Sequence, residues 1–164
     1  MAKFQYVKEL QHDAFQPPDV NVNEFDPEAI FISGCPFWQE TLFYSKKEGI
    51  RPWEKDPDKA CRKLAKQMTA ILGTMEARLR MRQKPESYLV RDALGIFLSV
   101  LFWSNQKPVS LINLKDSLAQ LDIKPLNIEE RLFYCLEKGN TFSGFRQLNE
   151  LLLEQRKLIA KKGV

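Results

Sequence analysis

The side chains that could do chemistry in this sequence are few and far apart. His12, the single histidine, is followed by Asp13, which could orient its ring, but nothing close by could be activated by it. The seven glycines form no phosphate-binding loop pattern. The sequence therefore shows no set of residues suited to acid–base catalysis, metal binding or nucleotide binding. The sequence predicts a protein that is not an enzyme and that binds neither a metal nor a cofactor.

Three cysteines offer the next possibility. Cys35 precedes Pro36 at the expected start of a helix, where the helix dipole lowers a thiol pKa and would favour a nucleophile or a redox sensor. Because it has no partner histidine, capping or burial is the favoured interpretation. Cys61 and Cys135 are expected to be buried like small hydrophobic residues. Since the N-terminus does not resemble a signal peptide, we expect free thiols in the cytoplasm.

An acidic cluster, Glu24, Asp26 and Glu28, could bind a divalent cation or act as an acid and base pair. No calcium-loop pattern follows it, which favours a solvated cluster. A second alternative is that this acidic segment folds over the basic part of the chain and masks it.

Basic residues gather in the middle of the chain. Residues 51–84 contain ten Lys/Arg and four Asp/Glu, although the whole chain has a net charge of only +4. A ridge of cations on a helix would bind nucleic-acid phosphates through counterion release. The alternative is a solvated helix face, and no helix-turn-helix or zinc-finger signature is present. The candidate nucleic-acid-binding residues are Lys59, Arg62, Lys63, Lys66, Arg78, Arg80, Arg82 and Lys84.

The elements that must position these residues are all helical. Apolar residues recur at three- and four-residue steps, and Pro and Gly mark the breaks. The patterns predict helices near 37–47, 57–83, 86–104, 111–121, 127–138 and 141–161. The third is apolar on nearly every side and is expected at the centre of one compact bundle. Its apolar core of about 15 residues is too short to span a membrane.

The N-terminal residues 1–28 contain helix breakers and are expected to form an extended arm across a single helical domain over residues 29–164. Aromatic side chains are dense just after this arm. We expect most of them in the core, but an exposed Trp38 or Trp53 would mark a groove for a protein partner.

Two stretches carry a family resemblance. The segments PFWQETLFY at 36–44 and PWE at 52–54, together with the C-terminal stretch from KPLNIEERLFY to LIAKK, resemble the YpoC-like family of small bacterial proteins over roughly residues 30–160. The resemblance implies an all-helical domain and supplies no catalytic motif. The family's association with DNA replication and repair genes implies a link to DNA maintenance.

Two functions compete on this basis. The first is a non-enzymatic adaptor that binds a protein partner through an aromatic groove or the last helix. The alternative is a nucleic-acid-binding accessory protein that uses the basic helix at 57–84. Binding of phosphates would weaken steeply with salt, whereas binding in an apolar groove would not.

Overall fold

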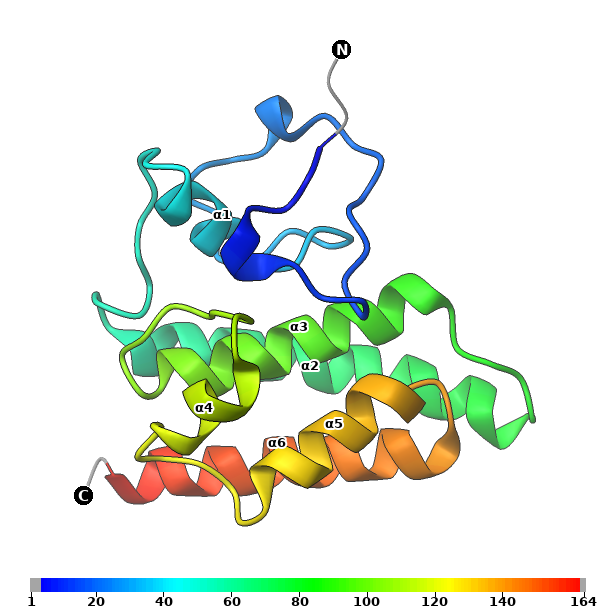
Figure 1. Ribbon diagram of the computed structural model, residues 1–164. Coiled ribbons are helices and arrows are strands. Elements are labelled where there is room, and N and C mark those ends of the chain that lie inside the picture. Colours follow the sequence, from blue (N-terminus) through cyan, green and yellow to red (C-terminus); the bar gives the residue numbers. More distant parts are fainter. Residues whose placement is uncertain (1–3, 163–164) are drawn as a thin grey trace.

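Six α-helices make up the regular structure of residues 4–162, the part of the chain that this computed structural model describes (Figure 1). Within these residues there is no strand beyond a single bridge between Ile32 and Cys35, which confirms the all-helical prediction. The helices are α1 (Trp38–Tyr44), α2 (Pro57–Arg80), α3 (Ser87–Trp103), α4 (Leu114–Ala119), α5 (Ile128–Lys138) and α6 (Phe142–Lys162).

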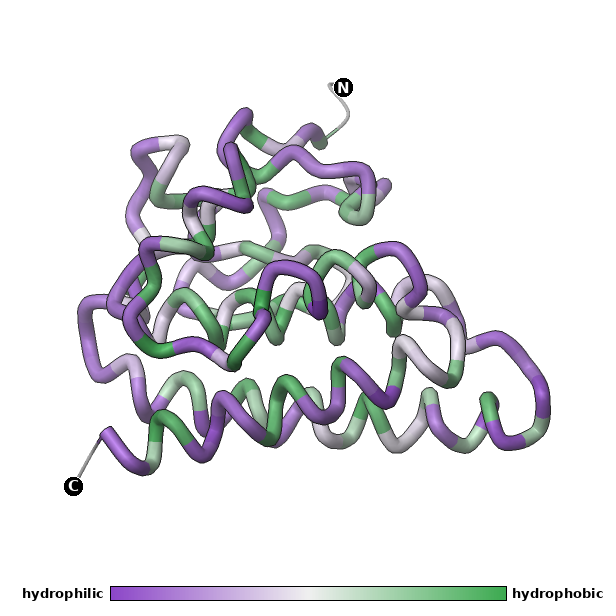
Figure 2. Tube along the Cα trace, turned by 60° about the horizontal axis from the view of Figure 1, so that its bottom comes forward, coloured by the Kyte–Doolittle hydropathy of each residue, from purple (hydrophilic) through white to green (hydrophobic). Residues whose placement is uncertain are grey.

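The helix α3 lies at the centre of the molecule, as its apolar sequence predicted. It packs against α2 and α6, and every residue from Asp92 to Trp103 is buried. The flanking helices are amphipathic, and Figure 2 shows hydrophilic and hydrophobic stretches alternating along α6. No helix within residues 4–162 is long and apolar enough to cross a membrane.

The ends of the helices follow the sequence signals in part. Asp56 is the N-cap of α2, and its Oδ1 accepts a hydrogen bond from the Lys59 amide at 3.3 Å. The helix continues through Gly73 without a break. Asn127 precedes α5, but its side chain makes no capping hydrogen bond and its backbone is left-handed at φ 55°. The Arg131 guanidinium donates to the Leu126 carbonyl, just before this helix, at 3.0 Å.

Residues 4–56 form a layer over one side of the helices α2 to α6 (Figure 1). We call this layer the cap and residues 57–162 the bundle. Within the N-terminal part of the cap, Tyr6, Leu10 and Phe15 are buried. The cap is mostly irregular backbone as far as residue 56. Two short 3-10 turns, Lys8–Leu10 and Val22–Glu24, and the seven-residue α1 are its regular elements.

The cap joins the bundle mainly along α3. Asp92 accepts hydrogen bonds from the Ser33 hydroxyl and the Gly34 amide, both at 2.9 Å. Gly95 lets Pro36 approach closely, since a Cβ at this glycine would lie 2.6 Å from the Pro36 Cβ. A short contact of this kind explains why a helix interior contains glycine here despite its low helix propensity.

Candidate functional site

Four cations on the first half of α2 form an exposed ridge. Lys59, Arg62, Lys63 and Lys66 are spaced by three and four residues, so they lie on one face of the helix. All four are exposed. None of them takes part in the ion pairs found within residues 4–162. These guanidinium and ammonium groups are therefore available to an external anion.

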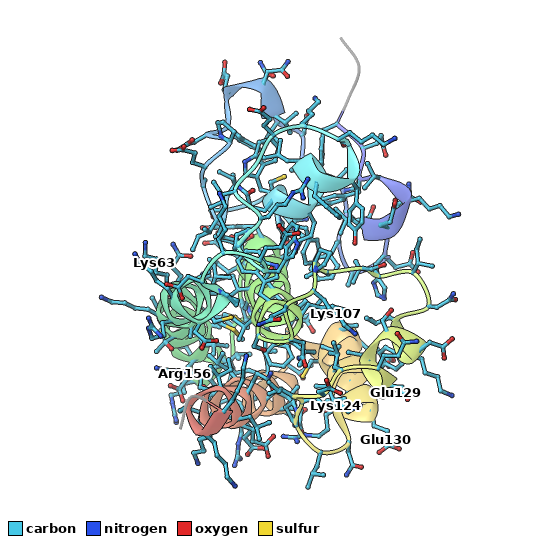
Figure 3. The ribbon with its side chains drawn as sticks, turned by 90° about the vertical axis from the view of Figure 1, so that its left-hand side faces the viewer. Lys63, Lys107, Lys124, Glu129, Glu130 and Arg156 are labelled. Atoms are coloured by element: carbon cyan, nitrogen blue, oxygen red, sulfur yellow. The ribbon has the colours of Figure 1, made fainter. Side chains whose placement is uncertain are left out.

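The end of α6 adds a fifth cation that the sequence did not connect with the other four. The helices α2 and α6 pack against each other. Figure 3 shows Lys63 of α2 and Arg156 of α6 on the same side of the molecule, and Arg156 is exposed. We call Lys59, Arg62, Lys63, Lys66 and Arg156 the basic face. Basic residues near the end of α6 were visible in the sequence, but their position opposite α2 depends on how the helices pack.

An open pocket of about 350 Å³ lies between α2 and α6 beside the basic face. Arg62 on α2 and Arg156 on α6 both line it. Cys61 also lines it, but burial raises the pKa of this thiol to about 12, which makes it a poor nucleophile. The other lining residues are mostly small or apolar: Asp58, Ala65, Val100, Ile159 and Ala160.

The second group of predicted cations, at 78–84, is not part of the same surface. Lys63 and Arg80 are about 25 Å apart along the helix at 1.5 Å per residue. The Arg78 Nε donates to the Lys84 carbonyl at 2.9 Å. Arg80 pairs with Glu76 at 2.9 Å and lies over the ring of Phe142. Only Arg82 and Lys84 of this group are exposed without such contacts, so the structure divides the eight candidate residues into two unlike sets.

The two tryptophans expected at a partner groove require a correction. Trp38 is 5% exposed and Trp53 is 2% exposed, so both belong to the core. Trp53 packs beside Trp103 with ring centroids 6.2 Å apart, and Trp38 meets Phe25 edge to face. The Trp53–Trp103 contact joins the cap to the bundle, the Trp38–Phe25 contact lies within the cap, and neither indole is left for a partner.

The other candidate groups are structural. Cys35 lies two residues before the N-cap of α1, and burial raises its pKa to about 11 instead of the helix dipole lowering it. Burial also raises the pKa of Cys135 to about 12. The His12 Nδ1 accepts a hydrogen bond from the Ala14 amide at 3.0 Å.

The acidic cluster lies in the cap. Trp38 donates to the backbone carbonyl of Asp26 at 2.8 Å, which places this segment over α1. Glu24, Asp26 and Glu28 are exposed, and none of them is ion-paired to α2 among the described residues. Across residues 4–162 no group of three or more His, Cys, Asp or Glu side chains could hold a metal ion.

Comparison with known proteins gives one match. A family model described as YpoC-like protein matches residues 58–164. No curated protein and no solved structure matches the chain. The matched range contains nearly all of the bundle, including the basic face and its pocket, and it leaves out the cap. The resemblance is thus confirmed from residue 58 onward, and its N-terminal part lies outside the matched range.

Proposed function

This chain belongs to the YpoC-like family, and on that premise we propose that it is a non-enzymatic accessory protein that binds the phosphate backbone of nucleic acid through its basic face. The observation that carries this proposal is a set of five exposed cations, on two helices, none of which takes part in an ion pair within residues 4–162. A role in DNA replication or repair, which the family resemblance implies, agrees with such binding.

The spacing of the cations supports a ligand over a merely solvated face. Lys59 and Lys63 are four residues apart, and so are Arg62 and Lys66. Like charges at this spacing repel each other and destabilise a helix by a few tenths of a kcal/mol per pair. A phosphate backbone removes that repulsion and gains free energy by releasing its counterions.

Fluorescence anisotropy with labelled single- and double-stranded DNA tests this function. Replacing Lys59, Arg62, Lys63 and Lys66 with Glu is expected to weaken binding about a hundredfold or more. The melting temperature should move by only a few degrees, because exposed surface substitutions change stability little.

A matched control reverses four other exposed cations, Lys8, Lys47, Lys138 and Arg146, and so produces the same net charge. This control should retain most of the affinity. Equal losses in both variants would show that only net charge matters, and no binding by the natural sequence at low salt would overturn the proposal.

A second candidate function, the protein-binding adaptor, is favoured by exposed apolar side chains on and beside α5. Leu126 is 84% exposed, and Phe133 and Tyr134 are also exposed. Exposed aromatic groups of this kind anchor protein interfaces. An adaptor would hold its partner at high salt and lose it in a Leu126→Ser, Phe133→Ser variant, whereas the variant of the basic face would keep it.

A further inference from the structure

The pocket between α2 and α6 combines two guanidinium groups, which suit phosphates, with an apolar lining and a carboxylate, which a phosphate backbone does not need. Arg62 and Arg156 supply two guanidinium groups from different helices. Ala65, Val100 and Ile159 supply an apolar lining. Asp58 supplies a carboxylate.

The carboxylate is the informative member of this set. The Oδ1 of Asp58 is buried and has no hydrogen-bond partner among residues 4–162. The side chain of Asp58 as a whole is only partly buried and lines the pocket, so its carboxylate can accept a hydrogen bond from a ligand that brings a donor. A phosphate group brings only acceptors, so it can pair with Arg62 and Arg156 but not with Asp58.

On the basis of the nucleic-acid binding proposed above, we propose that this pocket holds one unstacked base of a single strand. The base would lie on the apolar lining and against a guanidinium plane, a surface on which bases stack. One of its N–H groups would donate to Asp58. The flanking phosphates would contact Arg62, Arg156 and the lysines of the basic face. Because a base inside a duplex cannot enter the pocket without leaving the stack, the protein would prefer single strands.

The test measures the affinity of the full chain for three labelled probes at one salt concentration: a mixed-sequence DNA strand, an abasic strand of the same length, and a duplex. Base insertion predicts that the ordinary strand binds about tenfold tighter than the abasic strand, since stacking of one base contributes about that factor. The duplex should bind more weakly than the ordinary strand.

Two variants locate this preference in the pocket. Ala160→Phe fills it from the exposed side of α6 and should bring the ratio of ordinary to abasic affinity close to one. Asp58→Ala should lower the same ratio while slightly strengthening abasic binding, because a negative charge is removed. The matched control is Ala77→Phe, at an exposed position of α2 outside the pocket, which should leave the ratio unchanged.

The outcomes separate the two proposals. Equal binding of the ordinary strand, the abasic strand and the duplex would overturn base insertion and leave phosphate binding by the basic face in place. A preference for the ordinary strand that survives Ala160→Phe would overturn the assignment to this pocket. Absence of binding to all three probes would overturn the proposed function itself, and base insertion with it.

Discussion

The cap and the bundle are held in place by different forces. In the bundle, apolar side chains recur along α2, α3 and α6 and fill a shared core. In the cap, a few buried polar side chains hold irregular backbone in place. Gln39 donates to the carbonyls of Pro27 and Ala29. Glu40 accepts hydrogen bonds from the Trp103 indole and the Val109 amide.

This difference has a consequence for stability and for function. Apolar packing spreads stability over many contacts, so single exposed substitutions in the bundle cost little. Buried polar side chains such as Gln39 and Glu40 concentrate stability in a few residues, because the loss of one of them leaves buried hydrogen-bonding groups without partners. The proposed binding surface lies wholly on the bundle, which is also the part that the family model matches. The cap should therefore be the region most sensitive to single changes, and the bundle the region that carries binding.

The largest effect is expected from Glu40→Ala. Glu40 is fully buried, and its removal leaves the Trp103 indole N–H and the Val109 amide unpaired beside a cavity. We expect a loss of about 3 kcal/mol in the free energy of unfolding, measured by chemical denaturation. The exposed Glu48→Ala serves as control and should change it by less than about 0.5 kcal/mol. Equal small effects would contradict the concentration of stability in the cap's buried polar side chains.

A pair of glycines gives the next effect, with opposite signs. Gly95→Ala forces a Cβ against Pro36 at the junction with the cap and should cost about 1–3 kcal/mol. Gly73→Ala meets no atom within 4 Å on the exposed face of α2 and should stabilise the protein by up to about 1 kcal/mol. Hydrogen exchange should show faster opening of the cap in Gly95→Ala and not in Gly73→Ala. If exchange also became faster throughout the bundle, the cap would not open independently of the bundle.

A third effect, spread over several pH units, is a dependence of stability on pH. Burial raises the pKa of Glu40 from 4.5 to about 7. The folded state therefore retains a proton that the unfolded chain loses, and the stability from this group, complete below pH 4.5, is lost as the pH rises to about 7. The slope is at most about 1.4 kcal/mol per pH unit.

Glu40→Gln should reduce that slope. Some slope should remain, because burial also raises the pKa of Asp92. That group likewise makes the protein less stable as the pH rises. Denaturation curves recorded between pH 4.5 and 7 for both proteins check this, and identical slopes would exclude Glu40 as the titrating group.

The sequence predicted the helices well where the signals are local. The helical period of α2 and the apolar run of α3 depend on neighbours within a few residues, and these predictions are confirmed. The same period predicted that four cations of this helix are exposed, namely Lys59, Arg62, Lys63 and Lys66.

Contacts between segments that are distant in the sequence leave no such local signal. The position of Arg156 beside Arg62 depends on how α6 packs against α2. The engagement of Arg80 by Phe142 and the burial of Trp53 against Trp103 likewise arise from tertiary packing, which a one-dimensional pattern does not contain.

A salt titration of DNA binding tests the central claim, that free cations of the bundle bind phosphates, most directly. With about four phosphate contacts, log K should fall linearly against log salt with a slope near −3 to −4. Lys63→Ala should make this slope shallower by about one, while Lys47→Ala in the cap should leave it unchanged. A slope near zero, or the same slope in Lys63→Ala as in the natural sequence, would contradict the account.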